Sequence, residues 1–182
     1  MNHLGTQRIE TSRLVLRRFT LADADAMYKN WAGDPEVTKY LTWQTYSGVE
    51  TANEILSIWT KEYEKENFYQ WAIELKELGQ PIGSISVVEQ KEKAKVAHIG
   101  YCIGRNWWNR GIMSEALKAV MDFLFDEVGF NRLESRHDPN NPNSGKVMAR
   151  CGMKLECTMR QSDWNNQGIC DASWYALLKE ER

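Results

Sequence analysis

The chain has 182 residues, of which 42% are hydrophobic and 11% aromatic, which is enough for one sizeable core. Lys and Arg number 23 and Asp and Glu 25, and no long run of like charge occurs, so nothing indicates a nucleic-acid partner. No apolar run could cross a membrane and the N-terminus has no signal-peptide core, so we expect a cytoplasmic protein without a membrane partner. The four cysteines and three histidines lie at no metal-binding spacing, so no metal is predicted.

The first half of the chain predicts a strand, two helices and three strands. Alternating apolar and polar residues predict the first strand over 13–19, and helices follow over 20–31 and 46–65. Ser47 and Glu50 have the spacing of a capping box for the second helix. Three further strands are predicted over 69–76, 81–90 and 95–104. The short turns between them favour an antiparallel meander.

The second half changes to an alternation of helices and strands. A helical apolar stripe runs over 111–128 and ends at Gly129, a short strand covers 131–138, and Asn141-Pro142 opens another helix that closes at Gly152. Two strands, over 153–161 and 170–181, complete the chain. The strand–helix–strand unit from 95 to 136 is a right-handed parallel crossover. We therefore expect one α+β domain over 1–182, with about four helices and a mixed sheet, mostly antiparallel, that contains one parallel junction.

A ligand is expected at that junction. "NWWNRGIMSE" (106–115) leads from a strand into a helix, and the first amides of a helix have no internal partner. A glycine at 111 would let the backbone approach a phosphate oxygen closely. "HDPNNPNSGKVMARCGMKLE" (137–156) places a second helix start beside the same strand pair. Two such helix starts are typical of a nucleotide-like cofactor site, although each by itself is also compatible with a plain loop-to-helix junction.

Together with "ETSRLVLRRFTLADADAM" (10–27), these segments resemble the GCN5-related N-acetyltransferase (GNAT) family over nearly the whole chain, and most of all its branch that acetylates the N-termini of ribosomal proteins. The resemblance implies that acetyl-CoA is the co-substrate and that the parallel strands splay apart to receive it. The family's loop reads Gln/Arg-x-x-Gly-x-Gly/Ala, and here Trp108 and Met113 depart from it. Because the loop binds mainly through backbone amides, these departures weaken the motif more than the mechanism.

The resemblance also implies which residues bind the cofactor. The pyrophosphate is assigned to Asn109, Arg110, Gly111, Ile112, Met113 and Ser114. The pantetheine arm is assigned to Tyr101, Cys102 and Ile103, with a further contact from Asn141. Lys146 could reach an outer phosphate, but an exposed helix lysine is often only solvated. Asn141 could equally serve only as a helix cap. Trp107 and Trp108 are expected to wall or anchor the loop.

Three catalytic roles follow from the same resemblance. The amide of Ile103 would stabilise the oxyanion formed when the thioester is attacked. Ser144 would protonate the leaving thiolate, although water could replace it. Asp163 would act as the base, directly or through a water, or it could be an ordinary aspartate that opens a turn. An α-amine titrates near roughly 7.7–8.0, so a modest base suffices.

We therefore expect direct acetyl transfer to a primary amine in a ternary complex, with the N-terminus of a ribosomal or other protein as the acceptor. A small-molecule amine or antibiotic stays open as an alternative acceptor, because function resides in the site and not in the fold. A non-catalytic acyl-CoA-binding module is the alternative from another class. A covalent route through Cys102 is disfavoured, because no histidine is placed to activate it. The oligomeric state is left open, with a homodimer compatible with the fold.

Overall fold

The computed structural model describes residues 1–182, and its eight strands form one twisted sheet. The strands are β1 (Ile9–Glu10), β2 (Leu14–Arg17), β3 (Gln70–Leu75), β4 (Gln80–Lys91), β5 (Val96–Ile103), β6 (Arg132–His137), β7 (Lys154–Asn165) and β8 (Gly168–Leu178). Their order across the sheet is β1-β2-β3-β4-β5-β6-β8-β7. Only β5 and β6 are parallel, so the expected mixed α+β architecture is confirmed.

The parallel pair separates along its length. β5 pairs with β6 only from Val96 to His98, opposite Arg132 to Glu134. Beyond that point β5 continues to pair with β4 and β6 with β8, and the two diverge. Ser135 marks the divergence, where its hydroxyl donates to the Ile99 carbonyl at 2.7 Å. The remaining length of β5 therefore has an open edge, as the expected splay requires.

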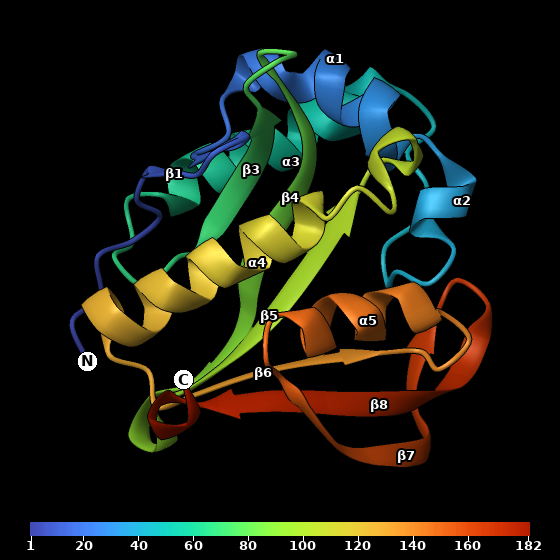
Figure 1. The fold of residues 1–182 in the computed structure, drawn as a ribbon. Helices are drawn as coiled ribbons and strands as arrows, with labels where there is room; N and C mark the ends of the chain where they lie inside the picture. The colour runs from blue at the N-terminus through green and yellow to red at the C-terminus, as the bar shows by residue number, and fades with distance from the viewer.

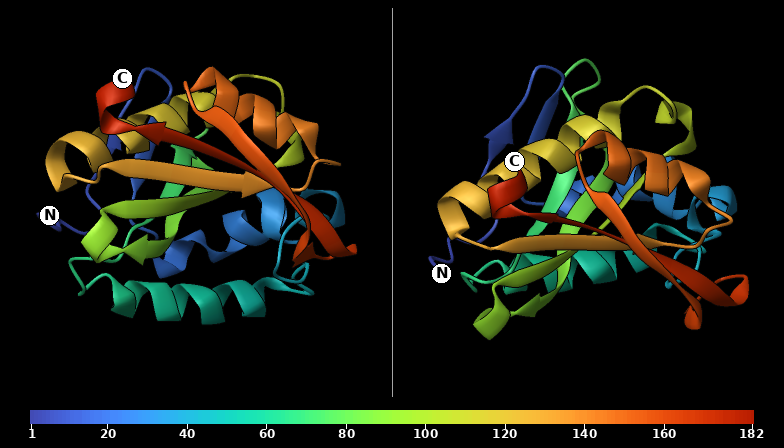
Figure 2. Two further views of the ribbon diagram at one scale, coloured as in Figure 1. Left: turned by 90° about the horizontal axis from the view of Figure 1, so that it is seen from below. Right: turned by 60° about the horizontal axis from the view of Figure 1, so that its bottom comes forward.

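Helices cover both faces of the sheet (Figures 1 and 2). The helices are α1 (Ala24–Met27), α2 (Pro35–Thr38), α3 (Val49–Glu62), α4 (Ile112–Phe123) and α5 (Pro142–Arg150). In Figure 1, α4 and α5 lie in front of the sheet, and α1 and α3 lie behind it. None of the helices is long and apolar enough to cross a bilayer.

The larger core lies between the sheet and α4. The predicted apolar stripe of this helix, including Leu117, Val120 and Leu124, is fully buried against strand residues such as Ile85 and Leu133. A π-helical turn over Leu124–Val128 extends the helix before it ends at Gly129, whose φ of 90° favours glycine. A smaller core forms on the other face, beneath α1 and α3. This packing fixes the start of α4 beside the end of β5.

Several local predictions differ from the structure. The second helix begins at Val49 with Gly48 as its N-cap, and Ser47 makes no capping bond. The predicted helix over 20–31 is broken into a 3₁₀ turn, α1 and a π turn. β1 and the four-residue α2 were not predicted. The seventh strand runs on to Asn165, because a bulge between Met159 and Asp163 absorbs the extra residues and keeps the chain paired with β8.

Candidate active site

The open edge of β5 presents backbone groups to the space between β5 and β6. The amide of Gly104 donates to the Ile82 carbonyl on β4 at 2.9 Å. Successive residues of an antiparallel strand alternate in the side to which their backbone groups point. Cys102 therefore faces β4, in line with its pairing to Ser84, whereas the backbone of Tyr101 and Ile103 faces the gap. Of the three predicted pantetheine contacts, only Tyr101 and Ile103 offer free main-chain groups.

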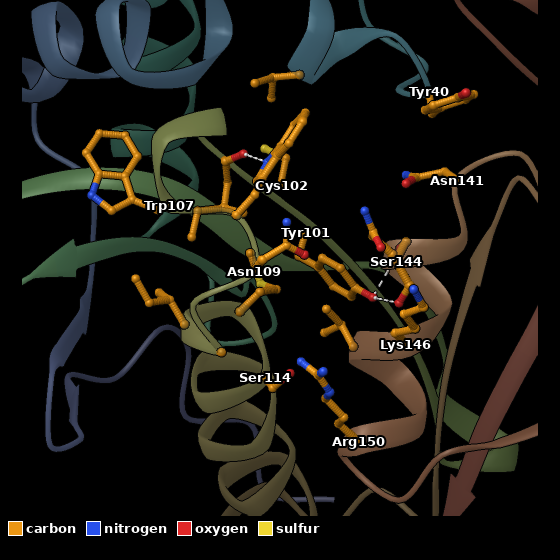
Figure 3. Close-up of a pocket in the computed structure, with 18 of the residues that line it drawn as sticks. Tyr40, Tyr101, Cys102, Trp107, Asn109, Ser114, Asn141, Ser144, Lys146 and Arg150 are labelled. Carbon is orange, nitrogen blue, oxygen red and sulfur yellow. Dashed lines mark hydrogen bonds between the residues drawn. The ribbon is translucent and has the colours of Figure 1, made fainter.

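A first cleft of about 230 Å³ lies at the ends of α4 and α5 (Figure 3). It is lined by Val37, Tyr40, Leu41, Tyr101, Cys102, Ile103, Trp107, Trp108, Asn109, Gly111, Ile112, Met113, Ser114, Asn141, Asn143, Ser144, Lys146, Val147 and Arg150. All the residues assigned to the cofactor from the sequence are in this set except Arg110. The fold thus gathers two segments that are far apart in the sequence around one cleft.

The loop before α4 has the backbone of an anion site. None of the amides from 109 to 114 donates a hydrogen bond within the chain. Asn109 and Gly111 both adopt left-handed conformations, with φ of 59° and 71°. A Cβ at Gly111 would meet only Arg13, at 3.7 Å, so the space above this residue is open. The buried hydroxyl of Ser114 also has no partner. Unpaired amides, an open glycine and a free hydroxyl together fit a diphosphate group.

The tryptophans before this loop anchor it. The indole N–H of Trp108 donates to the Ile103 carbonyl at 2.9 Å, and its side chain is 38% exposed. The ring of Trp107 lies against Gly104, where a Cβ would come within 2.7 Å of it. Trp108 therefore links the loop to Ile103, the last residue of β5. The Ile103 carbonyl, on the open edge, is already hydrogen-bonded.

α5 supplies cations and polar groups to the opposite wall. Lys146 and Arg150 are four residues apart, lie on the same side of the helix in Figure 3, and have no carboxylate within 4.0 Å. Arg150 was missed in the sequence, although its spacing from Lys146 would have indicated it. Asn141 is the N-cap residue, but its side chain makes no capping bond and instead borders the cleft.

Tyr101 and Ser144 meet across the gap. The Ser144 hydroxyl donates to the Tyr101 hydroxyl oxygen at 3.2 Å, and the Tyr101 hydroxyl donates to the Ser144 carbonyl at 2.9 Å (Figure 3). Burial raises the pKa of Tyr101, and the hydrogen bond with Ser144 acts in the opposite direction. The phenol therefore stays protonated at neutral pH. Its place beside Ser144 was not predicted from the sequence.

A second cleft of about 380 Å³ lies on the other side of this pair. It is lined by Tyr40, Leu41, Thr42, Val88, Glu89, His98, Ile99, Gly100, Tyr101, Ser135, Arg136, His137, Asp138, Asn141, Ser144, Asp163, Trp164, Asn165 and Cys170. Tyr101, Asn141 and Ser144 line both clefts, so the two spaces adjoin at the open edge of β5. Asp163, the predicted base, belongs to this second cleft.

Asp163 is held by an arginine that the sequence did not indicate. Arg136 on β6 donates to both carboxylate oxygens of Asp163 and lies over the ring of Trp174, 5.1 Å from its centroid. Partial burial raises the pKa of Asp163, but the bonds from Arg136 and from the Trp164 amide outweigh it, and the net pKa is lowered. The carboxylate is therefore ionised at neutral pH. It lies on the bulged strand β7, which continues past the predicted strand end at 161.

His98 lies beside this ion pair in the second cleft. Its Nε2 is 3.4 Å from the Arg136 guanidinium, and its buried Nδ1 has no partner. Burial and the charge of Arg136 lower its pKa to about 4. The imidazole is therefore neutral at neutral pH and adds no charge to the cleft.

The tip of the β7–β8 hairpin bridges the second cleft. Asn165 donates to the Asp138 carboxylate at 2.8 Å, at the end of β6. The next residue, Asn166, donates through its side chain to the carbonyls of Thr38 and Trp43 at 2.9 and 2.8 Å. Its amide oxygen accepts from Gln44 at 2.7 Å. Asn165 thus fastens the hairpin to the end of β6, and Asn166 fastens it to the segment around the end of α2; these contacts close one side of the cleft.

The geometry suits a class of protein that binds an extended, anionic ligand along an open strand edge, next to a second cleft. The comparisons with known proteins agree with it. The sequence matches the acetyltransferase (GNAT) domain family over residues 13–154, and the chain belongs to this family. It is accordingly an N-acetyltransferase.

Individual relatives extend over much of the chain. The uncharacterized N-acetyltransferase p20 of Bacillus licheniformis is 30% identical over 175 residues, which are 96% of this chain and 98% of that protein. The ribosomal-protein-serine acetyltransferase of Escherichia coli is 30% identical over 97 residues, 53% of this chain and 54% of that protein. Among solved structures, the ribosomal L7/L12 alpha-N-protein acetyltransferase RimL in complex with coenzyme A is similar with a TM-score of 0.85. That likeness has 21% identity and covers 97% of this chain and 100% of the other.

Proposed function

We propose that this acetyltransferase transfers the acetyl group of acetyl-CoA directly to the N-terminal α-amine of a polypeptide, with both substrates bound at once. The observation on which the proposal rests is that two clefts adjoin at Tyr101 and Ser144, on the open edge of β5. A donor in the first cleft and an amine in the second would reach one point from opposite sides. The similarity to ribosomal-protein acetyltransferases supports this class of acceptor.

The first cleft is proposed to bind the donor. The amides of the loop from 109 to 114 would bind the pyrophosphate, and Lys146 and Arg150 would attract the outer phosphate. The free amide and carbonyl of Tyr101 and the free amide of Ile103, whose carbonyl already accepts from Trp108, would pair with the pantetheine arm, as an added strand pairs with a sheet edge. Asn141 would add a side-chain contact, since its amide is not used as a cap.

The second cleft is proposed to bind the acceptor amine. Its lining holds three carboxyl groups, from Glu89, Asp138 and Asp163, against the single guanidinium of Arg136. An excess of carboxylates attracts a cationic amine and raises its local concentration. The aromatic side chains of Tyr40 and Trp164 offer apolar surface for the first side chains of a peptide.

The chemistry requires a base, an oxyanion donor and an acid. Asp163 is ionised and can accept the amine proton directly or through a water. The Ile103 amide faces the gap and can donate to the oxyanion. Ser144, whose hydroxyl contacts Tyr101, can return a proton to the thiolate. Direct transfer fits Cys102, because burial raises the pKa of its thiol and opposes formation of a nucleophilic thiolate.

A panel of acceptors tests the proposal. The protein is incubated with acetyl-CoA and peptides that begin with Ser or Ala, the same peptides with a blocked N-terminus, lysine side-chain analogues and small amines. We expect thiol release with the free N-termini and, by mass spectrometry, acetyl on the α-amine. Release only with small amines or with blocked peptides that contain lysine would refute the proposed acceptor. Acetyl-Cys102 after incubation with acetyl-CoA alone would refute direct transfer.

A further inference from the structure

Glu115, in the first turn of α4, is bound by residues from the other end of the chain. Its carboxylate accepts from the Thr11 hydroxyl at 2.6 Å, the Ser12 hydroxyl at 3.1 Å, and the Arg13 amide and Nε at 3.0 and 2.7 Å. The side chain of Glu115 is only 18% exposed. So many donors to one carboxylate fasten the turn between β1 and β2 to the start of the helix.

Arg13 extends this contact to the loop itself. Its Nη1 donates to the carbonyl of Arg110, the second residue of the segment from 109 to 114, at 2.9 Å. Its Nη2 lies 3.7 Å from the point that a Cβ on Gly111 would occupy. The guanidinium therefore joins Glu115 to the one loop carbonyl that separates two left-handed residues, Asn109 and Gly111.

The side chains of Ile112 and Met113 are buried in the core, but residues 109–111 have little else to hold them. The loop amides make no internal bonds, and the nearest fixed points are the Trp108 indole before the loop and the bond from the Glu115 amide to the Gly111 carbonyl after it. Left-handed backbone at a non-glycine residue such as Asn109 costs energy and persists where surrounding contacts impose it. The fork of Arg13 supplies such a contact.

The charge of Glu115 is a second reason for the position of Arg13 beside the loop. Glu115 places a carboxylate one turn from amides that suit an anion, where it would repel a phosphate. Burial raises the pKa of Glu115, but the bonds from Thr11 and Arg13 outweigh it and lower the pKa to about 2, so the carboxylate is ionised. The guanidinium of Arg13 offsets that charge on the side of the loop.

We propose that Arg13, oriented by Glu115, is a positioning residue that holds the loop from 109 to 114 in the conformation that binds the pyrophosphate of acetyl-CoA. The inference rests on the proposed function of the first cleft. It assigns a role to the segment "TSR" (11–13), for which the sequence predicted only a strand start. Arg13 acts through the loop and does not touch the reacting atoms.

Calorimetry with coenzyme A tests the proposal on the full chain. We expect Arg13→Met to weaken the affinity roughly tenfold, as the loss of about 1.4 kcal/mol would. Arg8→Met is the matched control, because Arg8 also pairs with a glutamate, Glu10, on the same segment but lies away from the loop. Arg13→Lys should recover only part of the affinity, since an ammonium restores the charge but not the fork.

A ligand without a pyrophosphate separates positioning from general damage. Pantetheine, titrated by NMR, should bind wild type and Arg13→Met equally. Glu115→Gln keeps an acceptor oxygen but loses the charge that orients Arg13, so it should weaken the affinity for coenzyme A roughly threefold. This variant replaces Arg13→Met as the test if Arg13→Met does not fold. The proposal would be overturned if Arg13→Met and Glu115→Gln bind coenzyme A as tightly as wild type, or if Arg8→Met loses as much coenzyme A affinity as Arg13→Met. A loss of pantetheine affinity in Arg13→Met that matches its loss of coenzyme A affinity would also overturn it. If wild type itself does not bind coenzyme A, the proposed function fails instead.

Discussion

At the scale of single residues, the loop before α4 acts through its backbone more than its side chains. Trp108 and Met113 stand where the family pattern has other residues. Trp108 donates its indole N–H to the Ile103 carbonyl, and Met113 is buried in the core, so both positions serve the packing of the loop. Gly111 is different, because its left-handed φ and the open space above it both depend on the missing side chain.

Gly111→Ala should therefore weaken coenzyme A binding. An added methyl group strains the left-handed φ of 71° and would lie 3.7 Å from Nη2 of Arg13, which contacts the loop. We expect roughly a tenfold loss of affinity by calorimetry, equivalent to about 1.4 kcal/mol. Gly129→Ala is the matched control, since Gly129 has a φ of 90° and open space but lies at the far end of α4. Equal affinity losses in both variants would remove Gly111 from the phosphate site.

Asp163→Asn should lower kcat/KM for the acceptor and leave coenzyme A affinity unchanged. Loss of a general base costs roughly 10²-fold or more. Without a base, the acid limb of the pH–rate profile should move toward the pKa of the α-amine, near roughly 7.7–8.0.

Arg136→Met separates catalysis by Asp163 from its ion pair. If Asp163 serves only to hold Arg136, both variants should show the same loss, and combining them should add nothing. An unchanged pH–rate profile in Asp163→Asn would argue against the base.

At the scale of elements, the β7–β8 hairpin forms one wall of the second cleft, the proposed acceptor site. The side chain of Asn166 makes three hydrogen bonds to residues 38–44. Its backbone amide donates a fourth, to the Leu41 carbonyl at 3.1 Å. The bridge joins two segments more than 120 residues apart in the sequence and leaves an acceptor fewer directions of approach.

Asn166→Ala should loosen this bridge. Removal of three side-chain bonds, each worth about 1 kcal/mol, should raise hydrogen exchange in both 38–46 and 160–170. We expect a lower kcat/KM for peptide acceptors with unchanged coenzyme A affinity. Gln167→Ala, at the exposed neighbouring position, controls for a change at the hairpin tip. Exchange that rises equally in both variants would contradict a specific bridge.

At the scale of the whole molecule, the stability of the fold depends on pH through one buried histidine. The separation of β5 from β6 opens the sheet, and the second cleft, which lies there, contains the neutral side chain of His98. His98 has a pKa lowered to about 4 by burial and by Arg136, against about 6.5 when unfolded. Between these values the unfolded chain binds one more proton than the folded chain, so the free energy of unfolding falls as the pH falls from 6.5 to 4.

His98→Gln should flatten that dependence. The lost slope is up to about 1.36 kcal/mol per pH unit within the window, and it should vanish above pH 6.5. Urea unfolding of both proteins at several pH values between 4 and 7.5 measures it. Parallel curves for the two proteins would show that His98 titrates alike in the folded and unfolded states.

The elements with strong periodicity were predicted well. The apolar stripe of α4 is buried along its whole length, and Gly129 and Gly152 follow the helices they were expected to end. Weak local signals were less reliable. Ser47 and Glu50 have capping-box spacing, but the helix starts after Gly48, and the bulge of β7 is not visible in an alternating pattern. Tertiary pairing decides such boundaries, because their local preferences are small.

The mixed sheet and its one parallel junction could be predicted from the amino-acid sequence, because periodicity, helix starts and glycines are local signals. The acetyltransferase family and most of the first cleft followed from the resemblance of its motifs to that family. The partner of each polar group was known only once the fold brought distant elements together. The fold paired Arg136 with Asp163, Ser144 with Tyr101, and Arg13 with the loop before α4. These contacts join residues 27 to 97 positions apart. The chain has many similar charged side chains, and a local sequence pattern does not say which two of them the packing of distant elements brings together.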